Sequence, residues 1–198
     1  MNWLSLTDVE ARVNALESLM VEKGLAEHEA VDAVVASFEN DMGPVNGAKV
    51  VARAWTEPEY REWLLSDATA AIADMGFTGL QTEHMVAVEN TAERHNVVVC
   101  TLCSCYPWTL LGIPPAWFKY PQYRARVVKE PRSVLAEFGV SLPDDVKIDV
   151  WDSSAEIRYL VIPQRPEGTE GLTEDELVPL ISRDSMVGTA LVTAEAAS

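Results

Sequence analysis

All the cysteines of this chain lie in one short stretch, which constrains the fold and the chemistry more than any other feature. Cys100, Cys103 and Cys105 are the three cysteines among 198 residues, at spacing i, i+3 and i+5. They follow the β-branched apolar run 97–99, which predicts a buried strand. Thiols this close on one loop can face a single point, and thiolates are the soft ligands of transition metals and iron–sulfur clusters. The sequence therefore predicts a metal site at the end of a buried strand.

Three sulfurs are one ligand fewer than a structural zinc site or an iron–sulfur cluster normally takes. A histidine could complete a Cys3His zinc site, with His84 or His95 as the donor. For His95, which directly precedes the strand, a hydrogen-bonded structural role is favoured. The main chain offers a second completion, because Ser104 and Cys105 both carry a peptide N–H that a tight turn could aim at the same ion. The residues alone leave both alternatives open.

Composition excludes several classes of partner. The formal net charge of −16 argues against nucleic acid and anionic membrane surfaces, which need patches of Lys and Arg. No segment reaches the length of a membrane span, and the N-terminus shows no signal peptide, so a cytoplasmic location is expected. Three clustered cysteines also fit no disulfide framework.

Hydrophobic periodicity predicts an α+β fold with two parts. Two amphipathic helices precede the break at Gly43-Pro44, and further helical segments follow as far as Gly76. Residues 1–43 are expected to form a helical N-terminal arm, and residues 44–198 a compact, layered α/β domain that carries the metal-binding cysteine loop. The strands of this domain are predicted at residues 85–88, 97–99, 146–151 and 157–162.

Residues 99–105, Val-Cys-Thr-Leu-Cys-Ser-Cys, are followed by Tyr-Pro-Trp, and this string resembles the metal-binding signature of the α subunit of nitrile hydratase. Thr101 matches the cobalt type of the family, whereas the iron type is similar but carries serine there. A close cousin is the metal-bearing subunit of thiocyanate hydrolase. The resemblance covers nearly the whole chain and continues through residues 111–119, 121–124, 130–132, 151–159, 163–166 and 183–186.

The resemblance implies one non-corrin Co(III) ion per chain, with Fe(III) as the second choice. Its ligands would be Cys100, Cys103, Cys105 and the main-chain nitrogens of Ser104 and Cys105. Cys100 would stay an unmodified thiolate, Cys103 would be a sulfinic acid and Cys105 a sulfenic acid. One coordination position would remain open for water or substrate.

The implied activity is hydration of nitriles to amides, a lyase reaction in which the metal acts as a Lewis acid. The sulfenate oxygen of Cys105 would either attack the nitrile carbon or orient a water that does. Ser104 and Gln81 complete the implied catalytic set, although Thr82 stands where the family usually has glycine. Trp108, three residues after Cys105, is the candidate for binding the small nitrile.

The resemblance also implies partners. A nitrile hydratase β subunit would form a heterodimer or an α2β2 heterotetramer, with the N-terminal arm embracing it, and an activator protein would deliver cobalt. Because no Lys or Arg lies between Cys100 and Gly112, the negative sulfur oxygens would be paired by two arginines of the β subunit. Arg124 or Arg126 is the internal alternative, and a solvated helix face is the other interpretation of this basic stretch.

Two rival functions remain at this point. One is hydrolysis of thiocyanate at the same type of centre, and the other is a non-catalytic zinc-binding or metal-delivery module. A C-x-x-C redox protein is disfavoured because the thioredoxin-like βαβ pattern around the motif is missing.

Overall fold

The computed structural model describes residues 6–40, 42–79, 84–103 and 105–194. These residues group into two compact units, Met1–Asp41 and Met42–Ser198. The first unit holds two helices, α1 (Leu6–Glu22) and α2 (His28–Asn40). Apolar side chains recur along α1 at helical spacing and are more than half exposed, at 57% for Val13, 62% for Leu16 and 51% for Leu19. The two predicted amphipathic helices are therefore confirmed.

The second unit opens with three short helices, α3 (Pro44–Thr56), α4 (Pro58–Ser66) and α5 (Ala68–Asp74). Proline in the first turn suits α3 and α4, because the missing N–H would be unpaired there in any case. The side chain of Asp67 caps α5 by accepting a hydrogen bond of 3.0 Å from Ala70 N.

Four strands form two parallel pairs. Strand β1 (Met85–Glu89) pairs with β4 (Arg158–Ile162), and β2 (Arg94–Val99) pairs with β3 (Lys147–Asp152). The register of the second pair sets Val99 opposite Asp152, so that the carboxyl ends of β2 and β3 meet.

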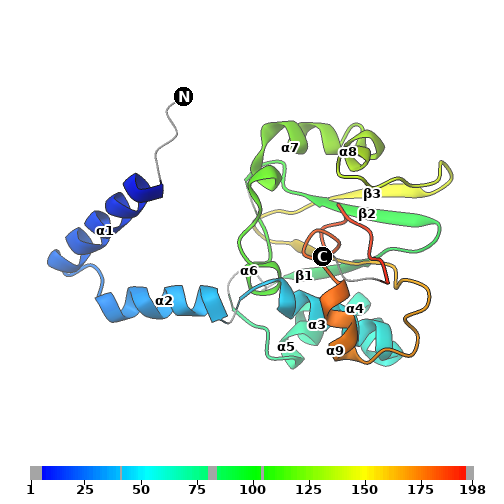
Figure 1. Cartoon of the computed structure of the whole chain (residues 1–198), viewed down its shortest axis with the longest axis horizontal. Coiled ribbons are helices and arrows are strands. Elements are labelled where there is room, and N and C mark those ends of the chain that lie inside the picture. Colours follow the sequence, from blue (N-terminus) through cyan, green and yellow to red (C-terminus); the bar gives the residue numbers. More distant parts are fainter. Residues whose placement is uncertain (1–5, 41, 80–83, 104, 195–198) are drawn as a thin grey trace. The chain divides into compact units, whose positions relative to one another are not determined.

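A C-terminal segment ties the two strand pairs together. Met186 O accepts a hydrogen bond of 3.0 Å from Val161 N on β4, and Val187 O accepts one of 2.9 Å from Val98 N on β2. The strands are covered on both sides, with α7 (Pro121–Val127) and α8 (Pro131–Glu137) nearest β2 and β3, and α4 and α5 nearest β1 (Figure 1). The remaining elements are α6 (Trp108–Leu111), η1 (Ala116–Lys119), α9 (Glu174–Leu177) and η2 (Val178–Leu180).

This architecture confirms the expected fold class of helices and strands in layers, with the cysteine loop between β2 and α6. The carboxyl end of strand β2 lies in the core, since Val97 and Val99 are 0% exposed, as is Cys100 directly after the strand. No helix among the described residues combines the length and apolar character that crossing a bilayer requires.

Candidate metal centre

The three cysteines meet at the carboxyl end of β2. Cys103 Sγ lies 3.3 Å from Cys100 Sγ and 2.8 Å from Cys105 Sγ, and all three sulfurs lie within 4.8 Å of one another. Cys100 is buried, Cys105 is half-buried and Cys103 is exposed, so the cluster runs from the core to the surface. The predicted convergence of the three sulfurs is therefore present.

Backbone hydrogen bonds fix the strand end from which the loop departs. Ser153 N donates to Val99 O at 2.7 Å, and Cys103 N donates to Cys100 Sγ at 3.3 Å. The second contact suits a thiolate, because an amide hydrogen bond stabilises negative charge on sulfur.

Thr101, directly after the first cysteine, is held from two sides. Asp152, the last residue of β3, accepts hydrogen bonds from Thr101 N at 2.9 Å and from Thr101 Oγ1 at 2.6 Å. Arg124 on α7 donates through Nη2 to Thr101 O at 2.9 Å. Its neighbour Tyr123 donates to Val98 O on β2 at 2.6 Å. Strand β3 and helix α7 thus position the loop together.

The thiol of Cys105 has a strongly perturbed acidity. Burial raises its pKa to about 12, helped by a hydrogen bond to Cys103 and by the neighbouring charges of Cys100 and Cys103. Three negative sulfurs cannot accumulate here unless a cation compensates them. The arrangement is suited to exchanging thiol protons for a metal ion.

Neither candidate histidine joins the cysteines. Among the described residues, the cysteines form the metal-binding group without any His, Asp or Glu. His95 is buried at the opposite end of β2, where its Nε2 donates to Gly188 O at 2.7 Å and its Nδ1 accepts from Asn90 Nδ2 at 3.3 Å. The structural role expected for His95 is confirmed, and the Cys3His alternative is not supported.

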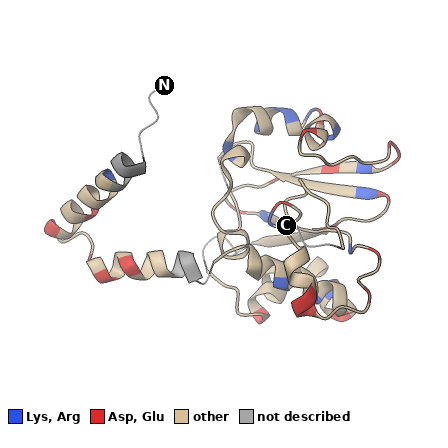
Figure 2. Ribbon diagram, viewed as in Figure 1, with Lys and Arg blue, Asp and Glu red and all other residues tan. Residues whose placement is uncertain are grey.

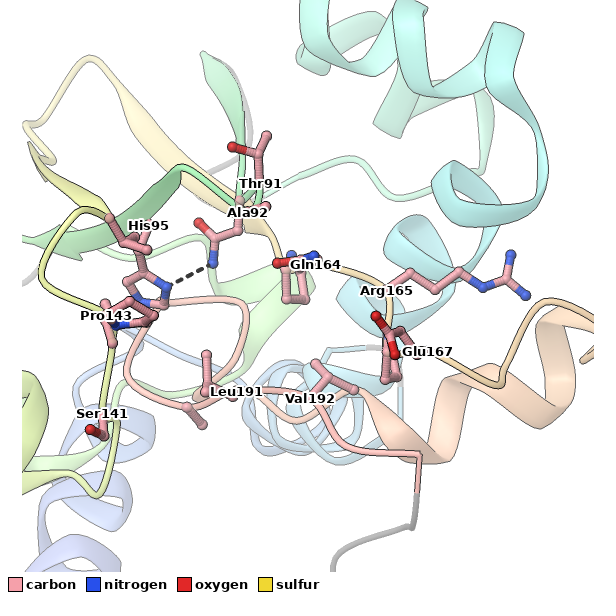
Figure 3. A pocket seen from close by; sticks show the side chains of 16 residues that line it. Thr91, Ala92, His95, Ser141, Pro143, Gln164, Arg165, Glu167, Leu191 and Val192 are labelled. Atoms are coloured by element: carbon pink, nitrogen blue, oxygen red, sulfur yellow. Dashed lines mark hydrogen bonds between the residues drawn. The ribbon is translucent and has the colours of Figure 1, made fainter.

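The ring of His95 lines a cavity of about 340 Å³, where it points toward Pro143 (Figure 3). Cys100 lies five positions after His95 along the extended chain, a distance of roughly 16 Å at 3.3 Å per residue. This cavity is therefore remote from the sulfurs.

The other predicted site residues have different outcomes. Gln81 and Ser104 lie outside the described residues. Trp108 opens α6 immediately after the loop and packs half-buried against the core. Trp117, a second tryptophan that the sequence alone could assign either to the substrate pocket or to the core, belongs to an aromatic cluster of the core. Its ring centroid lies 4.9 Å from that of Tyr123 and 4.8 Å from that of Phe138.

Asp152 is the site residue that sequence reasoning missed. Residues 152–154 read as a turn between strands, yet Asp152 ends β3 and binds the cysteine loop. The signal that could have found it is the parallel alignment of β2 with β3, which places a carboxylate at the end of one strand beside the cysteines at the end of the other.

The fold and the sulfur cluster define an α+β protein with a thiolate metal site. Comparison with known proteins identifies the family within this class. A model of the family described as "Nitrile hydratase, alpha chain" matches residues 7–190. The chain is 57% identical to the high-molecular weight cobalt-containing nitrile hydratase subunit alpha of Rhodococcus rhodochrous, over 92% of this chain and 90% of the relative. The chain therefore belongs to the nitrile hydratase α-chain family.

A solved structure agrees with this assignment. A double mutant of the Fe-type nitrile hydratase from Comamonas testosteroni Ni1 superposes with a TM-score of 0.89 at 42% identity, covering 98% of this chain and 95% of that one. Thiocyanate hydrolase subunit gamma of Thiobacillus thioparus is also related, at 40% identity over 94% of this chain and 81% of the relative.

Proposed function

We propose that this chain is the metal-bearing α subunit of a cobalt-type nitrile hydratase, which adds one water to a small nitrile to give the amide. The observation that carries the proposal is the meeting of three cysteine sulfurs within 4.8 Å at the end of β2. It occurs in a chain that is 57% identical to a cobalt-containing relative. The Fe-type structure, at 42% identity, stands further away.

The residues present fit a soft transition metal. The donor set is three sulfurs with no carboxylate or imidazole among the described residues, which suits a thiolate-binding ion and not a hard cation such as magnesium. Cys100, Cys103 and Cys105 would hold the ion, together with the main-chain nitrogens of Ser104 and Cys105. We propose Co(III), with Cys103 as a sulfinic acid and Cys105 as a sulfenic acid.

When bound, the ion supplies Lewis-acid activation of the nitrile or of a water. The side chains of this protein would contribute the nucleophile and the contacts to the substrate. Cys105, oxidised at its sulfur, would present an oxygen that attacks the nitrile carbon or aligns the attacking water, with Ser104 and Gln81 as its catalytic neighbours. Trp108 would give the hydrocarbon end of the nitrile an apolar contact.

Exposure of the site supports a protein partner. Leu102, which directly precedes the exposed Cys103, is 86% exposed. Ile113, after α6, is 62% exposed, and apolar side chains also remain exposed on α1. We propose that a β subunit covers these surfaces in a heterodimer or an α2β2 heterotetramer. The β subunit would also supply cations to the oxidised sulfurs. Cobalt delivery by an activator protein and a cytoplasmic location complete the proposal.

Co-expression with the β subunit of a cobalt-containing nitrile hydratase tests this function. We expect a stable complex that converts a small nitrile to its amide, while a Cys105→Ala complex does not. The cobalt-loaded chain alone should be inactive. Full nitrile hydration by the isolated chain would refute the role of the partner, and a complex that hydrolyses thiocyanate but leaves nitriles untouched would favour the related hydrolase.

A further inference from the structure

Helix α7 carries two arginines, Arg124 and Arg126, that have different partners; Figure 2 colours Lys and Arg blue along the ribbon. Both side chains are half-buried. Arg126 forms surface ion pairs, with Nε 2.7 Å from Glu130 and Nη2 2.6 Å from Glu137. Arg124 donates to two main-chain carbonyls, Thr101 O at 2.9 Å and Lys119 O at 3.4 Å. No ion pair within the described part of the chain includes Arg124, so its charge has no carboxylate within 4.0 Å.

The Thr101 carbonyl occupies a key position in the cysteine loop. Thr101 lies between Cys100 and Cys103, and Asp152 already binds its N–H and its hydroxyl. The bond from Arg124 holds the remaining polar atom of the same residue. The N–H of the peptide unit before Thr101 and the C=O of the peptide unit after it are both held, so neither unit can rotate without breaking a charge-assisted hydrogen bond.

The positive charge of Arg124 also favours the cysteine cluster. Collecting anionic sulfurs at one point is unfavourable, most of all at the buried Cys100, and a cation nearby reduces that cost. The sequence between Cys100 and Gly112 supplies no cation. Arg124 brings a guanidinium to the loop from a separate element, while the charge of Arg126 is neutralised by two glutamates.

We propose that Arg124 is a positioning residue of the metal centre, which locks Thr101 so that Cys100 and Cys103 stay poised for the ion. The proposal rests on the proposed function, because it takes cobalt as the ion bound by this loop. It also separates Arg124 from Arg126, whose side-chain hydrogen bonds among the described residues go to Glu130 and Glu137.

The test compares the full-length variants Arg124→Gln, Arg124→Lys and the matched control Arg126→Gln from the same helix. The apparent affinity for cobalt is measured by chelator competition, together with the visible sulfur-to-cobalt absorption. Loss of a hydrogen bond with a charged partner predicts an affinity about tenfold weaker for Arg124→Gln. Arg124→Lys should restore part of this loss, and Arg126→Gln should match the wild type in affinity and spectrum.

Wild-type affinity and an unchanged spectrum in Arg124→Gln would overturn the inference. If Arg124→Gln does not fold, the cobalt affinities of Arg124→Lys and Arg126→Lys are compared instead. Weaker cobalt binding by Arg124→Lys supports the inference, and equal binding by the two variants overturns it. A wild-type chain that binds no cobalt would instead refute the proposed function, so the two failures are distinguishable.

Discussion

Thr101 and Asp152 lie 51 residues apart in sequence, yet the Asp152 carboxylate accepts hydrogen bonds from both the backbone N–H and the hydroxyl of Thr101. The parallel pairing of β2 with β3 creates this contact, because it sets Val99 opposite Asp152 and leaves Thr101 just beyond the strand end. The cysteine loop is thus fixed by the register of two strands.

Replacing this carboxylate should weaken metal binding. In Asp152→Asn one acceptor becomes a donor that faces a Thr101 donor, so at least one hydrogen bond to a charged group, worth about 1.5–3 kcal/mol, is lost. We expect cobalt affinity to fall about tenfold or more. The control Thr101→Ser retains both donors and should bind nearly as the wild type does in the same chelator competition. Equal affinity in Asp152→Asn and wild type would show that this contact does not position the loop.

A glycine in the C-terminal segment should tolerate no side chain. Gly188 has φ +90, and a Cβ there would lie 1.9 Å from Asn96 O on β2. Gly168 has nearly the same backbone conformation, φ +83, with nothing within 4 Å of its Cβ position. Gly168→Ala should cost about 1–2 kcal/mol for the left-handed backbone alone. Gly188→Ala should cost more than about 4 kcal/mol or prevent folding, because it adds a collision with backbone.

Denaturant unfolding of the two alanine variants measures this difference. Similar losses of unfolding free energy in both would mean that the close approach of Gly188 to β2 does not exist in solution.

His95 should make the stability of the fold depend on pH. Burial lowers its pKa, which the hydrogen bond to Gly188 only partly offsets, and its neutral ring accepts from Asn90. The unfolded chain binds this proton near pH 6.5, whereas the folded chain binds it only at lower pH. The unfolding free energy should therefore fall as pH drops below about 6.5, by up to about 1.4 kcal/mol per pH unit, until the folded pKa is reached.

The comparison needs a variant that lacks the buried imidazole. In His95→Gln this part of the pH dependence should vanish, whereas His84→Gln, at an exposed position, should follow the wild-type curve. Parallel curves for wild type and His95→Gln between pH 8 and 5 would contradict the prediction.

Local patterns predicted the elements well. The β-branched run before Cys100 is a strand, and α3 begins at Pro44 of the Gly43-Pro44 break. Thr173, followed by three acidic residues, predicts a helix cap, and it forms the capping box of α9. Thr56, two residues before Pro58, also predicts the cap of the next helix, and this prediction is wrong. The Thr56 hydroxyl donates to Ala52 O within α3, and Glu57 takes the N-cap position of α4. Serine and threonine hydroxyls often make this backbone contact inside a helix, which competes with capping.

Contacts that depend on strand order and helix packing could not be predicted from one sequence. Nothing local distinguishes Arg124 from Arg126, but the geometry of α7 directs one to Thr101 and the other to two glutamates. In the same way, Gly188 marks a close approach only because β2 runs past it. The cluster of sulfurs was predictable because its three members are neighbours in sequence; the groups that hold it come from distant elements.

The oxidation state of the sulfurs is a separate prediction. The mature chain should carry two added oxygens on Cys103 and one on Cys105, an increase of roughly 48 Da, while Cys100 stays unmodified. Burial of Cys100 agrees with its protection, since oxidation follows exposure. Peptide mass mapping of an active sample checks this, and three alkylatable, unmodified cysteines in that sample would rule it out.

The central claim is that the three cysteines of one loop hold one cobalt ion per chain. Metal analysis of the purified wild-type complex beside Cys100→Ala, Cys103→Ala and Cys105→Ala tests it most directly, because the chain has no other thiolate to substitute. We predict one cobalt per chain in the wild type and none in each variant. Full cobalt content in any of the three variants, or zinc in place of cobalt in the active wild type, would contradict the account.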